Sequence, residues 1–416
     1  MMPTIAYLAN QFPSPVEPYV VDEILALRKI GVEVVPCSAW QAPPSTDPRE
    51  ALLARETLCL MSSKWRVMLY GAWLCLCRLP TLWEFIARVL FHGPESPFRR
   101  LKALCHTALG AYAAHVLAGR GVHHIHVHHG YFAAWVAMVA ARLLGISYSM
   151  TLHGSDLLVH DAYLDVKLSQ CRTCFTVSEY NRKYILTRFP ALTSTRVVVQ
   201  RLGVTPPLAS YRQSPPVTPS PCFVLLAVGR LHWVKNHAFL IKACSLLKER
   251  GLDFICLIAG EGPERPNLQR QIEISDLKRE VKLLGHVSHE TLEQLYPIVD
   301  LVILTSHSEG IPLTLMEAMV CERVVLAPRI TGIPELVIDG ETGFLYPAGS
   351  ITAFVERVER IHDSYSRLTW IRNSARRHVM THFNQAANLE NFTSTLVSQI
   401  PSSRQSYHVH PVLQQI

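Results

Sequence analysis

The sequence of 416 residues lacks the features that mark membrane-spanning, secreted and disordered chains. Its most apolar stretch, residues 67–79, is bracketed by Lys64, Arg66 and Arg78 and is shorter than the roughly 20 apolar residues of a spanning helix. The opening residues hold no basic segment followed by a long apolar one, so we expect no secretory signal and a cytoplasmic protein. Charged residues are scarce, at 18% against 49% hydrophobic, which excludes a disordered chain.

The sequence also lacks a clear disulfide or metal framework. Its cysteines number eleven, and several stand within apolar runs, which indicates reduced core thiols. Cys171 and Cys174 have CxxC spacing, but no second pair follows at a spacing typical of zinc sites, so we expect no metal there. A histidine cluster also suggests zinc and comprises His123, His124, His126, His128 and His129. Because neighbouring side chains of a strand point to opposite faces, we expect no metal in this cluster either.

Positive charge is concentrated in the first half of the chain. Residues 1–200 hold 19 Lys+Arg against 13 Asp+Glu, whereas residues 201–416 hold 21 against 20. We find no nucleic-acid recognition motif and expect no nucleic acid partner. Trp65, Trp73 and Trp83 stand among aliphatic and basic residues, which favours peripheral contact with an anionic membrane, on the inner face of the cytoplasmic membrane. The alternative is that these helices only fill the core.

Short apolar runs alternate with helical patterns in both halves, which predicts parallel sheets. The expected strands are residues 4–9, 32–40, 123–128, 148–153, 174–178 and 197–203, then 223–229, 254–260, 281–286, 301–306 and 324–328. Proline- and serine-rich residues 205–221 read as a linker. We therefore predict an α/β protein with two Rossmann-like doubly wound domains, residues 1–204 and 222–400, followed by a flexible tail at 401–416.

Two loops of the second domain carry residues suited to a diphosphate. The segment GRLHWVKNH begins at Gly229 and places Arg230 and Lys235 before a helix. A helix N-terminus offers unpaired amides and a positive dipole end to an anion, and two cations add charge-assisted hydrogen bonds. A solvated basic loop is the alternative interpretation.

The segment SEGIPLTLME places Glu309 and Glu317 eight positions apart. Because the chain is expected to be helical from Pro312, Glu317 should project from the second turn while Glu309 stays in the loop. Two carboxylates can then reach different hydroxyls of one ligand. Alternatively, Glu317 is a surface residue, and Glu309 only complements the helix dipole.

These motifs together resemble those of the retaining glycosyltransferases of family 4, which have the GT-B fold. The resemblance rests on E-x7-E, on the upstream GRL and lysine, and on TGIPELVIDGETGFL at residues 331–345. In the first half, residues 125–156 and 177–185 are similar to two further family segments. The exopolysaccharide and colanic-acid branch is the most similar one. The resemblance implies that the two domains face each other across a cleft.

The resemblance also implies roles for single residues. Arg230 and Lys235 would bind the nucleotide diphosphate and stabilise the leaving group, Glu317 would bind the ribose, and Glu309 would bind hydroxyls of the donor sugar. His153, in the segment HGSD, would approach the transferred sugar. No metal or other cofactor is implied. The donor site would be lined by Gly229, Gly310, Ile311, Pro312 and Leu313.

Two positions depart from the family pattern. Gln11 to Ser14 replace a glycine pair in the first loop, and Pro206 and Pro207 replace an aromatic residue after Gly203 and Val204. The acceptor loop is therefore not transferable from the family. The expected function is transfer of a hexose, with retention, from a UDP- or GDP-sugar to a saccharide acceptor that is lipid-linked. The alternatives are a nucleotide-sugar epimerase and a sugar-nucleotide-binding protein without turnover.

Overall fold

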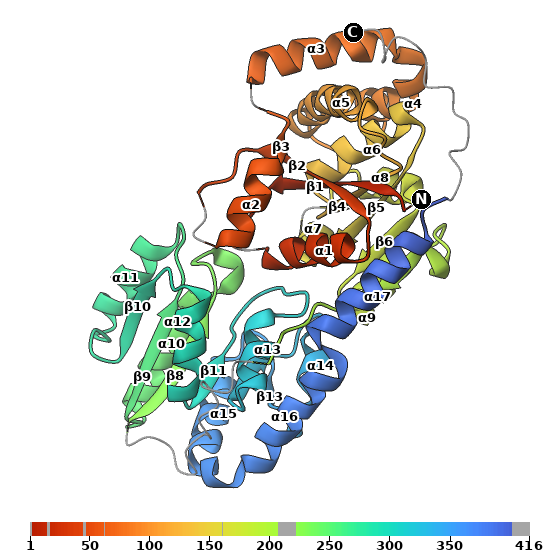
Figure 1. The fold of residues 1–416 in the computed structure, drawn as a ribbon. Coiled ribbons are helices and arrows are strands. Elements are labelled where there is room, and N and C mark those ends of the chain that lie inside the picture. Colours follow the sequence, from red (N-terminus) through yellow and green to blue (C-terminus); the bar gives the residue numbers. More distant parts are fainter. Residues whose placement is uncertain are drawn as a thin grey trace. The chain divides into compact units, whose positions relative to one another are not determined.

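The structure is a computed structural model that describes residues 2–14, 17–44, 47–61, 63–159, 161–206 and 222–401. The chain divides into two compact units (Figure 1). The first comprises Met1–Val177, Asn181–Gln200 and Leu389–Ile416, and the second comprises Ser178–Tyr180 and Arg201–Asn388. Each unit contains one parallel sheet, and the predicted pair of Rossmann-like α/β domains is therefore confirmed. The predicted cleft between them stays a prediction.

The first unit is built on a seven-stranded sheet in the order β3-β2-β1-β4-β5-β6-β7. Every neighbouring pair of strands is parallel. The strands are β1 (Thr4–Gln11), β2 (Glu33–Trp40), β3 (Leu58–Cys59), β4 (His124–His128), β5 (Ser147–Leu152), β6 (Thr173–Thr176) and β7 (Val197–Val199). The chain runs outward from β1 to β3 and then returns beside β1 as β4, so the order reverses between β1 and β4.

Helices cover both faces of this sheet. Successive side chains of its strands point to opposite faces, and both sets are largely apolar, so each face needs a covering layer. Ala6 and Leu8 of β1 lie in the core under α3 to α6, whereas Ile5 and Tyr7 lie in the core under α1 and α17 (Gln385–Ser398). The helices are α1 (Pro18–Lys29), α2 (Pro48–Glu56), α3 (Lys64–Cys77), α4 (Leu79–Phe91), α5 (Pro97–Ala118), α6 (Phe132–Leu144), α7 (Ser155–Leu158), α8 (Leu164–Gln170) and α9 (Glu179–Arg188).

The second unit is built on a six-stranded sheet in the order β10-β9-β8-β11-β12-β13, again parallel throughout. The strands are β8 (Phe223–Val228), β9 (Phe254–Ala259), β10 (Val281–Gly285), β11 (Leu301–Ile303), β12 (Val324–Pro328) and β13 (Phe344–Tyr346). Its helices are α10 (His237–Glu249), α11 (Arg265–Ile274), α12 (His289–Leu295), α13 (Leu313–Val320), α14 (Ile333–Leu336), α15 (Ile351–Asp363) and α16 (Thr369–His382). Helix α17 (Gln385–Ser398) begins in this unit and continues in the first. The order of this sheet reverses between β8 and β11.

The end of the chain differs from the predicted boundary at residue 400, because residues from Leu389 onward group with the first unit. Phe392 and Leu396 of α17 are buried in the core that contains Tyr7 and Phe175. The rings of Phe175 and Phe392 are 5.2 Å apart. The apolar face of this helix therefore decides its partner, which helical periodicity alone does not reveal.

Several other expectations can be compared with the fold. All eleven expected strands are present, and the structure adds β3 and β13, of two and three residues, which were not expected. The predicted linker and tail lie outside the described residues, apart from Thr205, Pro206 and Pro401. Within the part of the chain that the structure describes, no helix is both long enough and apolar enough to cross a membrane.

Candidate functional site

Two loops follow the strands at which the second sheet reverses its order. Residues 229–236 follow β8, and residues 304–312 follow β11, which is the neighbour of β8. Ligands of open parallel sheets bind beyond the carboxyl ends of the strands at such a reversal. Both loops lead into helices, α10 and α13, so two helix N-termini with unpaired amides lie at this edge of the sheet.

A lysine and a glutamate from these loops form an ion pair. Lys235 Nζ lies 2.5 Å from Glu309 Oε1, and Ser306 Oγ donates to the same oxygen at 2.6 Å. The side chains of Lys235 and Glu309 are 23% and 11% exposed. Gly229 lies beneath this lysine, because a Cβ built on Gly229 would be 3.4 Å from Lys235 Cδ. The pair is therefore held in place and still reached by solvent.

Hydrogen bonds fix the two loops to each other. Thr305 Oγ1 donates to the carbonyl of Lys235 at 3.0 Å, and the amide of His307 donates to the carbonyl of Val234 at 2.8 Å. Thr331 Oγ1 donates to the carbonyl of Glu309 at 2.6 Å. Gly332 permits this approach, because a Cβ there would lie 2.4 Å from the carbonyl oxygen of Gly310. The TGIPE segment therefore supports the loop that carries Glu309.

Arg230 stands in the same loop as Lys235 and is exposed. Its guanidinium makes no hydrogen bond or ion pair with any residue that the structure describes. Nearby His237, the first residue of α10, is buried, and its pKa is lowered to about 4 by burial and then by the charge of Lys235. His237 is thus neutral at physiological pH, and Arg230 and Lys235 supply the positive charge of this loop.

Glu317 occupies the second turn of α13, as expected, and its carboxylate has partners of its own. Tyr296 donates its hydroxyl to Glu317 Oε2 at 2.7 Å, and His289 Nδ1 lies 3.8 Å from Oε1. Burial raises the pKa of Glu317 above its ordinary value, although His289 and Tyr296 partly offset this effect. The carboxylate is therefore held in one orientation at a cost in solvation, which is typical of a group kept for binding.

The remaining residues predicted for this site lie at the start of α13. Pro312 precedes the first helical residue, Leu313, which is one position later than predicted. Ile311 is buried in the core, so only its backbone is available to a ligand. Gly310 is partly exposed. Ser308, which the sequence did not single out, has a buried hydroxyl oxygen without a partner in the described residues.

His153 belongs to the first unit and follows strand β5. Its Nε2 lies 2.9 Å from Nδ1 of His128, and Nε2 of His128 lies 2.9 Å from Oε2 of Glu23. Tyr7 donates its hydroxyl to the same oxygen of Glu23. The ring of Tyr19 stacks on His153 with centroids 4.8 Å apart. A polar chain therefore runs from the carboxyl end of β5 into the interior.

A cluster of three charged side chains lies beside this series of polar contacts. His129 Nε2 is 2.8 Å from Glu17, and its Nδ1 is 3.5 Å from Asp156. These carboxylates outweigh the effect of burial and raise the pKa of His129 to about 10, so this ring is a cation at neutral pH. Its charge and the amides of His153 and Gly154 lower the pKa of Asp156 in spite of burial.

Three of the histidines of β4 share one face of the sheet, which differs from the expected separation of the cluster by alternation. Alternation separates His123 from His124, but it places His124, His126 and His128 on one face, where all three are fully buried. Glu23, His126 and His128 offer ligand atoms within 4.8 Å of one another, which is a spacing that a metal ion can occupy. However, Ser149 and Thr151 already contact both ring nitrogens of His126. The absence of a metal stays a prediction.

A cavity of about 980 Å³ lies in the first unit, away from these residues. Its lining includes His123, Ser147 and Arg172, which precede or begin β4, β5 and β6. It therefore lies at the amino ends of the strands, opposite to the edge where ligands of such sheets bind. Three of its lining arginines already contact side-chain or backbone oxygens and are Arg142, Arg172 and Arg196.

Comparison with known proteins supports the reading of the motifs. Residues 214–378 match the family model described as glycosyl transferases group 1. An alpha-D-kanosaminyltransferase of Streptomyces kanamyceticus is 33% identical over 34% of this chain and 36% of its own length. The amylovoran biosynthesis glycosyltransferase AmsK of Erwinia amylovora is 33% identical over 39% and 41%. The chain thus spans less than half the length of these relatives, and the resemblance to glycosyltransferases is confirmed for that part.

Solved structures share the fold over nearly the whole chain. A sucrose-phosphate synthase from Thermosynechococcus elongatus has a TM-score of 0.74 at 17% identity, covering 96% of this chain and 100% of its own. Anabaena HepE in complex with UDP and glucose has a TM-score of 0.69 at 17% identity with the same coverage. At such identities the likeness shows the fold, and the predicted GT-B fold class is confirmed.

Proposed function

We propose that this protein is a retaining glycosyltransferase that moves a hexose from a UDP- or GDP-sugar to a saccharide acceptor in polysaccharide biosynthesis. The observation that carries the proposal is the set of Arg230, Lys235 and Glu309 at the order reversal of the second sheet, beside the N-termini of α10 and α13. The relatives named for amylovoran biosynthesis and the group 1 family match support the reaction class. Retention is included because the motif resemblance implies it.

The charges fit the chemistry of the donor. When the bond between the sugar and the diphosphate breaks, negative charge grows on the diphosphate oxygens. Fixed cations and helix amides stabilise this charge more in the transition state than in the ground state, so they accelerate the reaction. Arg230 and Lys235 would supply the cations, and the proposal therefore includes no metal ion.

The two glutamates fit the hydroxyls at either end of the donor. Glu317, held by Tyr296, would accept hydrogen bonds from the ribose, and Glu309 would accept one from the sugar. UDP is favoured as the nucleotide because the HepE structure of the same fold contains UDP and glucose. The contact of His153 with the transferred sugar remains part of the proposal.

A lipid-linked acceptor is favoured by the surface of α3. Trp65, Leu69, Trp73 and Leu76 are 84%, 71%, 43% and 72% exposed, and they recur every three or four residues on one side of this helix. The opposite side packs on α5, which Gly71 permits because a Cβ there would lie 2.1 Å from a carbonyl oxygen of α5. Such an exposed apolar stripe is suited to an interface between water and lipid.

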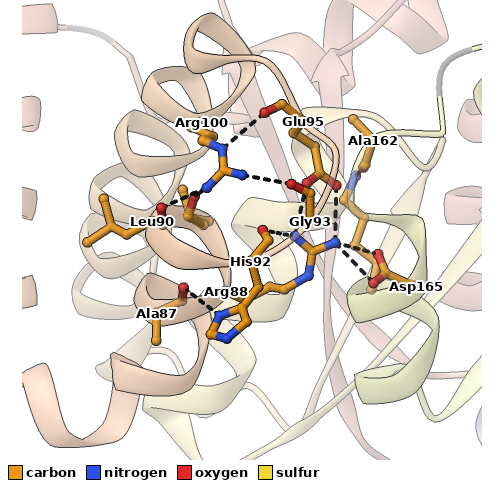
Figure 2. Close-up of polar contacts among 11 residues, drawn as sticks. Ala87, Arg88, Leu90, His92, Gly93, Glu95, Arg100, Ala162 and Asp165 are labelled. Atoms are coloured by element: carbon orange, nitrogen blue, oxygen red, sulfur yellow. Dashed lines mark hydrogen bonds and ion pairs between the residues drawn. The ribbon is translucent and has the colours of Figure 1, made fainter.

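The charge around this stripe is positive. Residues 64–118 hold seven Lys+Arg against two Asp+Glu. Figure 2 shows that two of the arginines are used internally: Arg88 contacts Glu95 and Asp165, and Arg100 donates to backbone carbonyls, including those of Leu90 and Gly93. The exposed cations left for a partner are Lys64, Arg66, Arg99 and Lys102. We propose that α3 and these cations dock on an anionic bilayer.

Sedimentation with vesicles that contain phosphatidylserine tests this docking. Because each basic residue near such a surface contributes about 1 kcal/mol, replacing Lys64, Arg66 and Arg99 with glutamine should weaken partition roughly 100-fold. Trp65→Ser with Leu69→Ser should weaken it also at high salt, whereas Trp370→Ser, in the second unit, should not. Unchanged partition, or a change of oligomeric state instead, would overturn the membrane proposal.

The reaction is tested by following UDP and GDP released from a panel of sugar nucleotides, with and without membrane lipid extract. Acceptor-stimulated release in EDTA, with a glycoside as product, is the expected result. Conversion of the donor into an isomeric sugar nucleotide without acceptor would identify an epimerase instead. Tight binding of the nucleotide without any release would identify a binding protein.

A further inference from the structure

The polar chain behind His153 determines which ring nitrogen of this histidine carries a proton. Glu23, His128 and His153 are joined in series by two contacts of 2.9 Å, and Glu23 and His128 are buried. Tyr7 donates its only hydroxyl proton to Glu23, so its oxygen, which lies 3.0 Å from Nε2 of His128, can only accept from that nitrogen. A carboxylate accepts hydrogen bonds and donates none, so the nitrogen of His128 that faces Glu23, Nε2, must carry a proton.

The protonation of the remaining ring nitrogens of His128 and His153 follows from this first step. A neutral His128 protonated at Nε2 has a lone pair at Nδ1, which must accept a proton from the facing Nε2 of His153. His153 is then protonated at Nε2 and carries its lone pair at Nδ1. Nδ1 of His153 makes no hydrogen bond to any residue that the structure describes, and it is not closed off from solvent. It can therefore accept a hydrogen bond from outside.

The competing arrangement places a second proton on His128, which would then donate to His153 and reverse the tautomer. His129 is already a cation, and its centroid is 4.5 Å from that of His153, so it disfavours a further positive charge shared between His128 and His153. His126, which faces His128 from the same strand with ring centroids 5.2 Å apart, is fully buried, and burial lowers its pKa. The nearby carboxylates Glu17 and Asp156 are paired with His129.

Stacking fixes the orientation of the ring as well. Tyr19 of α1 lies over His153 with an interplanar angle of 30°. The backbone amide of His153 donates to Asp156 at 3.1 Å, so the strand end is also held. Burial, followed by the charge of His129, lowers the pKa of His153, which keeps the ring neutral.

We propose that Glu23 and His128 are positioning residues that hold His153 in the Nε2-protonated tautomer, so that its Nδ1 accepts a hydrogen bond from a substrate hydroxyl. The identity of this hydroxyl as one of the transferred sugar rests on the proposed function. The tautomer itself depends only on the chain of contacts in the first unit.

Nitrogen-15 NMR of the histidine rings tests the proposal without any substrate. The signals of His153 are assigned by their loss in His153→Gln. We expect a protonated Nε2 and an unprotonated Nδ1 at neutral pH. Tyr7→Phe, which keeps the contact of Glu23 with His128, should preserve this tautomer, whereas Glu23→Gln, whose amide can donate to His128, should give a mixture or the opposite tautomer. A protonated Nδ1 in the unaltered protein would overturn the proposal.

Kinetics then separate this inference from the proposed function. If both hold, Glu23→Gln should lower kcat about tenfold or more, as partners that orient a functional histidine do, and change KM for the donor little. The expected tautomer without any glycosyl transfer would overturn the proposed function alone. Glycosyl transfer with kcat unchanged in a Glu23→Gln variant of altered tautomer would overturn the positioning role alone.

Discussion

The ion pair of Lys235 with Glu309 leads to an unusual expectation: removing the negative charge of Glu309 should strengthen the binding of free UDP. In the present structure Lys235 Nζ is only 2.5 Å from Glu309 Oε1, so the carboxylate competes with a diphosphate for the same cation. Glu309→Gln keeps the size of the side chain and can still accept from Ser306. Lys235 then faces the nucleotide without a competing anion.

The magnitude follows from the exposure of the pair. Exposed ion pairs contribute about 0.2–1 kcal/mol, and this pair, at 23% and 11% exposure, should reach about 1 kcal/mol. Since 1.4 kcal/mol is tenfold, UDP should bind about fivefold more tightly to Glu309→Gln. Turnover should nevertheless fall by roughly 10–100-fold, because a hydrogen bond from the sugar to a charged group contributes about 1.5–3 kcal/mol.

Isothermal titration with UDP and with the intact donor measures both effects on one protein. The control is Glu359→Gln, which makes the same charge change on α15, where Glu359 pairs with Arg250. Its UDP affinity should stay at the level of the unaltered protein. If Glu309→Gln bound UDP equally or more weakly while melting at an unchanged temperature, Lys235 would not be the diphosphate ligand.

Three further predictions concern stability. Because the pKa of Glu317 is raised, the stability linked to this group is greatest below the ordinary glutamate pKa and is lost as pH rises through the raised value. Glu317→Gln should therefore raise Tm at pH 7 and weaken nucleotide binding. A lower Tm would contradict this expectation. His129, with a pKa of about 10, contributes stability that is lost between about pH 6.5 and 10. The dependence of Tm on pH over this window should therefore be weaker in His129→Gln than in the unaltered protein. An equal dependence in both proteins would argue against the ion pairs of His129. Arg88→Met leaves the Glu95 side chain, which is 6% exposed, without its cation and should lower the free energy of unfolding in urea by about 3 kcal/mol. Arg99→Met, at an exposed position, should lower it by under about 0.5 kcal/mol. Equal losses would refute the role of Arg88 as the partner of Glu95.

Much of the fold is predictable from the sequence because its strands are buried on both faces. Runs such as residues 223–229 and 254–260 are continuously apolar and end at glycine, so their position and type follow from local composition alone. The place of α17 depends instead on which surface buries Phe392 and Leu396. That choice is a property of the folded chain, and no local pattern contains it.

The candidate site divides in the same way. Arg230, Lys235, Glu309 and Glu317 stand in segments with a recognisable spacing, and the structure brings Lys235 and Glu309 into direct contact. Among their partners, Ser306 lies in the loop of Glu309, and Thr331 begins the TGIPE segment that the sequence marks. Tyr296 and His289 come from other elements and carry no signal in sequence. Likewise, alternation along β4 indicates that His126 and His128 share a face, but Glu23 joins them only through the packing of α1.

The decisive experiment on glycosyl transfer compares the unaltered protein with Arg230→Ala. Labelled hexose is supplied from a panel of sugar nucleotides, with a lipid-extract acceptor and in the presence of EDTA. Arg230 is exposed and makes no side-chain hydrogen bond or ion pair with the described residues, so Tm should not change. We expect a glycoside from one donor and a loss of transfer of about 100-fold or more in the variant. Equal transfer by both proteins, or no glycoside from any donor, would contradict this expectation.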